Sequence, residues 1–261
     1  LKQSFINKKI YISLFIFLSC YSNILCQNLE LKVTTKDSSK QKFINQLNYK
    51  KQHPNFKSLS AELDSIIHFS QKKGYIDARK IEVEKEKKAT IYIGKVELGS
   101  FYKETTLYLQ NSDSINQELK LKETKLQDSV TLPTENIEQY LISLNEEISN
   151  KGRPFSSIQL TNIKKEKNRL IAEMAISSSK KRTLDKITIK GYEKFPHSFL
   201  NNYLRLKTGK EFNKTSINKK TKALQNLSFA NQIRKPEVLF TNDSTTVFLY
   251  LEKQNSNLFF C

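Results

Sequence analysis

Residues 184–213 read LDKITIKGYEKFPHSFLNNYLRLKTGKEFN, and residues 235–253 read KPEVLFTNDSTTVFLYLEK. In the first stretch, Ile187 and Ile189 alternate with polar residues, which is the period-2 pattern of a half-buried strand, and Gly191 ends that strand. The second stretch alternates in the same way over residues 245–251. The two patterns predict a strand at each end of a unit that spans residues 182–253.

Two helices are expected between these strands. Ser198 is a suitable N-cap for the first, whose apolar face is Phe199, Leu200, Tyr203 and Leu204. Gly209 closes that helix and the turn after it, and Asn213 caps the second, whose apolar stripe is Ile217, Leu224 and Leu227. A strand near residues 233–240 then forms a hairpin with the last strand, and Pro236 places it at a sheet edge or at a bulge, because proline has no N–H to donate.

This order of elements resembles a POTRA domain, the polypeptide-transport-associated module of the outer-membrane assembly and secretion family that includes BamA, TamA and the two-partner secretion transporters. The matching positions are Gly191, Leu204-x-Leu206-x-x-Gly209, Ile217, Leu224, Phe229 and Leu249-Tyr250-Leu251. Ser228 departs from the family, which often has glycine before the aromatic residue. An unrelated small α+β domain with the same element order is the alternative interpretation.

The resemblance implies an α+β fold of tandem small domains, each with the order β-α-α-β-β and a three-stranded mixed sheet covered by two helices on one face. Such a sheet has an outer strand whose backbone N–H and C=O groups can pair with an extended chain. We therefore expect unfolded outer-membrane or secreted polypeptides to bind by strand addition, with assembly lipoproteins and a membrane barrel as further partners. The expected client-binding edge is Ile233, Arg234, Lys235, Val238, Leu239 and Phe240.

A weak internal repeat extends this interpretation to the rest of the chain. Gly74 and Gly152, about 78 residues apart, each follow an amphipathic helical pattern and precede a predicted hairpin of two strands. Ser58 is the expected N-cap of the first of these helices. Residues 96–99 are expected to begin a middle domain, in which the first helix is missing or remodelled. The predicted domains are residues 27–95, an irregular 96–181, and 182–254.

The N-terminus has the pattern of a secretory signal peptide. Residues 10–26 read IYISLFIFLSCYSNILC, follow Lys2, Lys8 and Lys9, and become polar before a helix could cross a membrane. Cleavage between Cys26 and Gln27 is expected, which gives residues 1–26 as the signal and the Gram-negative periplasm, beside the outer membrane, as the destination. An uncleaved anchor and a lipoprotein acylated at Cys20 remain the alternatives; the second would make the chain a structural adaptor.

The net charge of +18 raises the question of nucleic-acid binding. The lysine pairs are scattered along the chain, and only six of the 44 basic residues are arginine, the residue that best forms bidentate contacts with phosphates and bases. A solvated lysine surface is the preferred interpretation, contact with anionic lipid headgroups the second, and no nucleic-acid partner is expected. A secreted basic adhesin is a third functional class, and would bind polyanions with steep salt dependence.

The sequence has no pattern typical of an enzyme, a metal site or a cofactor site. His53, His68 and His197 do not lie in metal-ligand spacing, and removal of the signal would leave Cys261 as the only cysteine. Neither a G-x-S-x-G elbow nor a complete phosphate-binding loop is present. Residues 255–261 resemble the stub of a barrel, so we expect a truncated product or a free-standing periplasmic piece.

Overall fold

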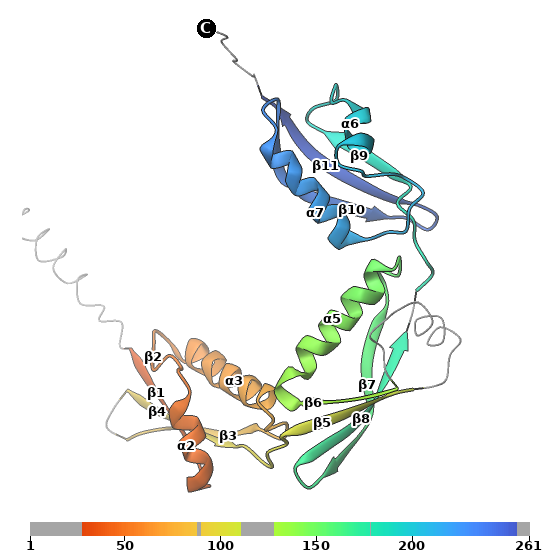
Figure 1. Ribbon diagram of the computed structural model, residues 1–261. Coiled ribbons are helices and arrows are strands. Elements are labelled where there is room, and N and C mark those ends of the chain that lie inside the picture. Colours follow the sequence, from red (N-terminus) through yellow and green to blue (C-terminus); the bar gives the residue numbers. More distant parts are fainter. Residues whose placement is uncertain (1–27, 88–89, 111–127, 178, 255–261) are drawn as a thin grey trace, which may run out of the picture. The chain divides into compact units, whose positions relative to one another are not determined.

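The computed structural model describes residues 28–87, 90–110, 128–177 and 179–254 (Figure 1). The predicted signal peptide, with Cys20, Cys26 and Gln27, and the predicted barrel stub at residues 255–261 lie outside the described residues. The chain forms two compact units, Leu1–Tyr102 and Lys103–Cys261. Their described residues contain three β-sheets, one in the first unit and two in the second.

The first unit has one mixed sheet of strand order β2-β1-β4-β3. β1 and β4 run parallel, with Leu31 opposite Tyr92, and β3 pairs antiparallel with β4. Its elements are β1 (Leu29–Thr35), α2 (Ser38–Gln46), β2 (Gln52–His53), α3 (Phe56–Lys72), β3 (Arg79–Lys85) and β4 (Ile91–Glu97). The core joins alternate residues of β1 and β4 to the apolar stripes of both helices, as the periodicity predicts: Leu31, Val33, Ile44, Leu59, Leu63, Ile66, Ala78, Val96 and Leu98.

Two local expectations in the first unit are wrong. Asn55, not Ser58, caps α3, since the Asn55 side chain accepts a hydrogen bond from the Ser58 N–H. The Ser58 hydroxyl instead contacts the ring of His53, which is buried beside it. Residues 96–99 do not form the first strand of a second sheet, because β4 runs through Glu97 and both Val96 and Leu98 belong to the core of the first sheet.

The first sheet of the second unit has strand order β6-β5-β8-β7, with β5 and β8 parallel. Its elements are β5 (Glu104–Leu109), β6 (Ser129–Pro133), the 3-10 helix η2 (Thr134–Asn136), α5 (Ile137–Asn150), β7 (Ser157–Glu166) and β8 (Arg169–Ser177). Leu144 and Ile148 of α5 pack against Leu107 and Met174 of the sheet. Where the β-α-α-β-β order would have its first helix, the described residues have β6 on the free side of β5.

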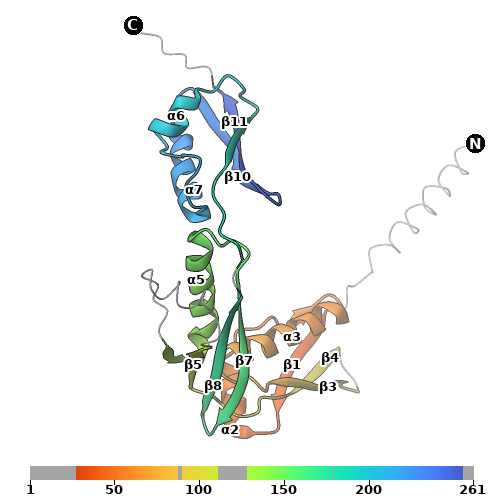
Figure 2. The same cartoon turned by 90° about the vertical axis from the view of Figure 1, so that its right-hand side faces the viewer.

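The last sheet has strand order β10-β11-β9 and agrees closely with the sequence. Val247 of β11 lies opposite Ile187 of β9 in a parallel pair, so the final hairpin packs against the first strand as predicted. The elements are β9 (Lys186–Lys190), α6 (His197–Asn202), α7 (Lys214–Thr221), the 3-10 helix η3 (Lys222–Asn226), β10 (Ala230–Phe240) and β11 (Thr245–Lys253). Figure 2 shows α6 and α7 together on one side of β10 and β11.

The two helices that cover the last sheet begin differently: α7 has a side-chain N-cap and α6 has none. Asn213 caps α7 by accepting from the Ser216 N–H at 2.6 Å, as predicted. Ser198 does not cap α6, because the helix begins one residue earlier, at His197, after Pro196. The core below both helices contains Val247, Leu249 and Leu251 of the central strand, all fully buried. The predicted α+β class is therefore confirmed, with small helix-covered sheets as its units.

Candidate functional site

The candidate site is the outer strand of the last sheet, β10. The six residues expected to bind a client all lie on this one strand: Ile233, Arg234, Lys235, Val238, Leu239 and Phe240. On one side β10 pairs with β11, and within the described residues no strand pairs with its other side. Its second row of backbone groups therefore faces outward, which is the geometry that strand addition requires.

The six side chains divide between the two faces of the sheet. Val238 and Phe240 pack against the core under the helices, and Phe240 contacts the ring of Phe212 with ring centroids 5.1 Å apart. Leu239 is 50% exposed and Ile233 is 56% exposed. The strand therefore anchors itself through one set of apolar residues and presents another to solvent.

Pro236 lies in a distorted part of β10, as the sequence predicts. The pairing with β11 shifts register twice, once between Gln232 and Arg234 and again between Arg234 and Glu237. Each shift places one more residue on β10 than on β11, which is the signature of a β-bulge. The two bulges divide the outer edge into short regular segments.

A small cluster on the exposed face connects the two sides of the second bulge. The Tyr250 hydroxyl donates to Glu237 Oε2 at 2.6 Å, and the guanidinium of Arg234 lies 3.4 Å from the centre of the Tyr250 ring. Arg234 and Glu237 also form an ion pair at 3.2 Å. The hydrogen bond to Glu237, followed by burial, raises the pKa of Tyr250. The hydrogen bond from Tyr250 to Glu237 joins β10 to the central strand where the backbone ladder is interrupted.

Two further strands occupy the same outer position, and sequence reasoning did not single them out as sites. β3 is the outer strand beside β4, and its register shifts between Lys80 and Glu82. β7 is the outer strand beside β8, and its register shifts between Thr161 and Lys164. A sequence signal existed, because each was predicted as the first strand of a hairpin and each contains an isoleucine next to two basic residues.

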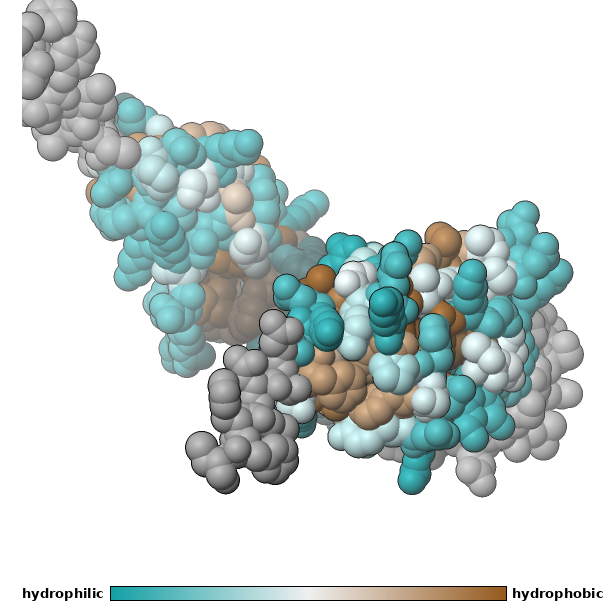
Figure 3. All heavy atoms as spheres, turned by 90° about the horizontal axis from the view of Figure 1, so that it is seen from above, coloured by the Kyte–Doolittle hydropathy of each residue, from teal (hydrophilic) through white to brown (hydrophobic). Residues whose placement is uncertain are grey.

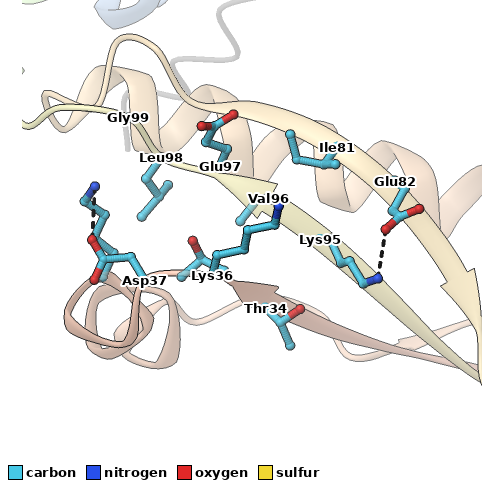
Figure 4. Close-up of a pocket in the computed structure, with 12 residues that line it drawn as sticks. Thr34, Lys36, Asp37, Ile81, Glu82, Lys95, Val96, Glu97, Leu98 and Gly99 are labelled. Atoms are coloured by element: carbon cyan, nitrogen blue, oxygen red, sulfur yellow. Dashed lines mark hydrogen bonds and ion pairs between the residues drawn. The ribbon is translucent and has the colours of Figure 1, made fainter.

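The first unit also has an open hollow of about 650 Å³ where β1 ends and α2 begins (Figure 4). Ile81 of β3 and Leu98 line its apolar side. Lys95 bonds to Glu82 at 2.8 Å and also to Glu84, and these two hydrogen bonds raise the pKa of Lys95. The charge of Lys95 in the hollow is thus already matched by a partner.

Within the described ranges, no group of three or more histidine, cysteine, aspartate or glutamate side chains could hold a metal ion. No helix among the same residues is both long and apolar enough to cross a membrane.

Seen from above, the surface is mostly hydrophilic, with apolar residues in smaller patches (Figure 3).

Comparison with known proteins assigns the last sheet. Residues 183–252 match the POTRA family model, described as a surface antigen variable number repeat. A comparison with curated proteins found no match. Several solved structures resemble the chain at low sequence identity.

The crystal structure of Haemophilus influenzae BamA POTRA3-5 is 14% identical to this chain, with a TM-score of 0.51; the match covers 86% of this chain and 96% of that one. POTRA1-2 of the periplasmic domain of Omp85 from Anabaena is 15% identical over 59% of this chain and 95% of that one, with a TM-score of 0.35. CdiB from Acinetobacter baumannii is 16% identical over 57% of this chain and 29% of that one, with a TM-score of 0.30.

The family match covers the stretch on which the sequence resemblance rests, from the strand at Ile187 to the hairpin at Leu249. The BamA likeness extends the same fold, at low identity, over most of the chain. The resemblance drawn from the sequence is therefore confirmed: residues 183–252 match the POTRA family model, and most of the chain has a fold like that of BamA POTRA3-5.

Proposed function

We propose that this chain is the periplasmic POTRA portion of an outer-membrane protein assembly or secretion factor. It binds unfolded client polypeptides by strand addition at β10 and passes them to a membrane barrel. The observation that carries the proposal is the outward row of backbone groups on β10, beside exposed Ile233 and Leu239. An added strand pairs through its main chain, so one edge accepts many sequences.

The bulges of β10 set the strength of this binding. Backbone pairing can extend only over a short stretch on either side of Pro236, because proline donates no hydrogen bond and the bulges turn the edge. Few hydrogen bonds form at once, and ordering the client costs conformational entropy. Weak and reversible binding follows, which suits a module that must release each client to the next step.

The proposed location and partners follow from the same features. The signal-like N-terminus directs the chain out of the cytoplasm. Unfolded outer-membrane or secreted polypeptides, assembly lipoproteins and a barrel are then the partners. The basic surface, dominated by lysine, supports contact with anionic lipid headgroups better than readout of nucleic acid.

A nuclear magnetic resonance titration tests the proposal. Residues 27–254, which contain all three cores, are labelled with ¹⁵N and titrated with a ten-residue peptide from a barrel strand. Backbone amide signals of β10 should shift in a saturable manner, while those of the central strand β11 should move less. The control peptide carries proline at alternate positions and cannot pair as a strand. If the β10 signals do not shift, or shift equally with the control peptide, strand addition at this edge is contradicted.

A further inference from the structure

Three bulges on three outer strands share one chemical feature. Ile81 is the extra residue between Lys80 and Glu82 of β3, and Ile233 is the extra residue between Gln232 and Arg234 of β10. In β7, the shift between Thr161 and Lys164 includes Ile163. Each sheet thus presents an isoleucine at the point where its outer strand leaves the regular ladder.

These isoleucines are unusually exposed for their type. Ile81 is 47% exposed, Ile163 55% and Ile233 56%. Among the described residues only one other isoleucine is similarly exposed, Ile142 on α5 at 45%. Three of the four exposed isoleucines therefore lie at outer-strand bulges, whereas most other apolar residues of the sheets pack into the cores, with Leu239 and Tyr108 as exposed exceptions.

A purely protective role for the bulges does not explain this pattern. Bulges and lysines on an outer strand discourage edge-to-edge aggregation. An exposed isoleucine acts in the opposite direction, because it adds apolar surface to the same edge. Protection alone would be better served by a polar residue at the extra position. The repeated isoleucine indicates that an apolar side chain of a binding partner covers each edge.

Each isoleucine also adjoins two consecutive basic residues. The sequences are Arg79-Lys80-Ile81, Ile163-Lys164-Lys165 and Ile233-Arg234-Lys235. Arg79, Lys80 and Arg234 make exposed ion pairs inside the protein, with Glu97, Asp64 and Glu237. Exposed pairs of this kind contribute little and can exchange partners at small cost. The basic pairs therefore favour an acidic residue in whatever lies beside the isoleucine.

We infer that β3, β7 and β10 each bind the same class of segment: an extended polypeptide that places an apolar side chain against the bulge isoleucine and an acidic residue against the adjoining basic pair. This inference rests on the proposed strand addition, and it names what the edges select. It also gives the chain three equivalent sites instead of one, so a long client with several such segments binds more tightly than a short peptide.

Three labelled peptides and two variants test the inference in residues 27–254. The first peptide has ten residues of alternating leucine and threonine with a glutamate at each end. The second has lysine at each end, and the third has proline at alternate positions. The test variant combines Ile81→Thr, Ile163→Thr and Ile233→Thr, which keeps a β-branched residue at every site. The control variant is Ile142→Thr, since Ile142 is equally exposed but lies on a helix.

Binding is measured by fluorescence anisotropy at low and high salt. The glutamate peptide should bind the unmodified chain more tightly than the lysine peptide. High salt should reduce this difference in affinity, because it screens the charges. The triple variant should bind the glutamate peptide about tenfold more weakly, because the apolar contact is lost at every one of the three sites, whereas Ile142→Thr should bind normally.

The outcomes separate the inference from the function on which it rests. If the unmodified chain binds neither charged peptide, or binds the proline peptide equally well, strand addition itself is wrong. If it binds as a strand but the triple variant binds unchanged, or the two charged peptides bind alike, the selection by isoleucine and basic pair is wrong. Sedimentation of the unmodified chain and the triple variant tests the remaining possibility. If only the unmodified chain self-associates and both bind the peptides equally, the edges bind a second copy of this chain, and the inference is overturned.

Discussion

Gly191 shows how a single residue can control the closure of a sheet. Its φ is +86°, and a Cβ added there would lie 2.5 Å from the carbonyl oxygen of Leu251 in the central strand. Gly209 has a similar φ of +76°, yet a Cβ there would meet no atom within 4 Å. The two glycines share the left-handed conformation but differ in their surroundings, so they form a natural matched pair.

The first prediction uses this pair. Gly209→Ala should destabilise the last sheet by about 1–2 kcal/mol, the cost of placing an L-residue in the left-handed region. Gly191→Ala should cost clearly more, because the chain around Leu251 must also move. Native-state hydrogen exchange of the β11 amides measures both changes. Equal losses in the two variants would show that the close contact at Gly191 has no energetic weight.

The second prediction concerns the pH response of Asp37, which caps α2. Hydrogen bonds from Ser39, and then from Lys40, lower the pKa of Asp37 from 3.8 to about 2. A depressed pKa contributes stability that is complete above pH 3.8 and is lost as the pH falls toward 2. Carboxyl resonances followed through an acid titration should show this midpoint, and Ser39→Ala should move it back toward 3.8. A midpoint near 3.8 in the unmodified chain would contradict the capping contacts.

At the scale of the element, capping shows which local features the sequence can predict. Asn213 was predicted as the cap of α7 and its side chain accepts the Ser216 N–H. Ser198 and Ser58 were also reasonable caps, but α6 and α3 begin at residues before them. A capping residue is recognised by type, whereas the first turn of a helix is chosen by the packing of the whole apolar stripe. Short helices therefore shift by a residue or more around an acceptable cap.

The third prediction follows from the Asn213 cap. Asn213→Ala should destabilise the last sheet by about 1 kcal/mol, because the Ser216 N–H loses its acceptor. Asn213→Asp should be neutral or slightly stabilising, since the carboxylate accepts the same bond and lies at the positive end of the helix. Denaturant unfolding, followed through signals of the last sheet, compares the two. An equal loss of stability in the two variants would show that the effect does not come from the capping hydrogen bond.

Outer strands show where sequence reasoning stopped short. The edge position of β10 could be predicted because Pro236 excludes a central strand. β3 and β7 contain no proline, so they lack the local feature that marked β10 as an outer strand. Their bulges depend on the register of pairing with β4 and β8, a long-range property that alternation along one strand does not encode.

At the scale of the molecule, the sequence predicted the kind of building unit better than its limits. The last sheet was recognised because its predicted strands and helices have clear periodicity. The first sheet was predicted to end near residue 95, yet the structure places Val96 and Leu98 in its core. In the middle sheet, β6 is short and follows a polar stretch, so neither its existence nor its place beside β5 could be predicted. The division into domains at 95 and 181 stays a prediction.

One regularity of the three sheets bears on how the chain is made. In every sheet the strand that is last in sequence, β4, β8 or β11, lies inside and pairs on both sides. Lys186 of β9 therefore has no parallel partner until Thr246 has been synthesised and delivered. A chain that emerges from the ribosome or a secretion pore with its N-terminus first must keep each module open until the final strand arrives. Each sheet can therefore be completed only after its last strand has emerged, and until then the earlier strands remain unpaired on the side that this strand will occupy.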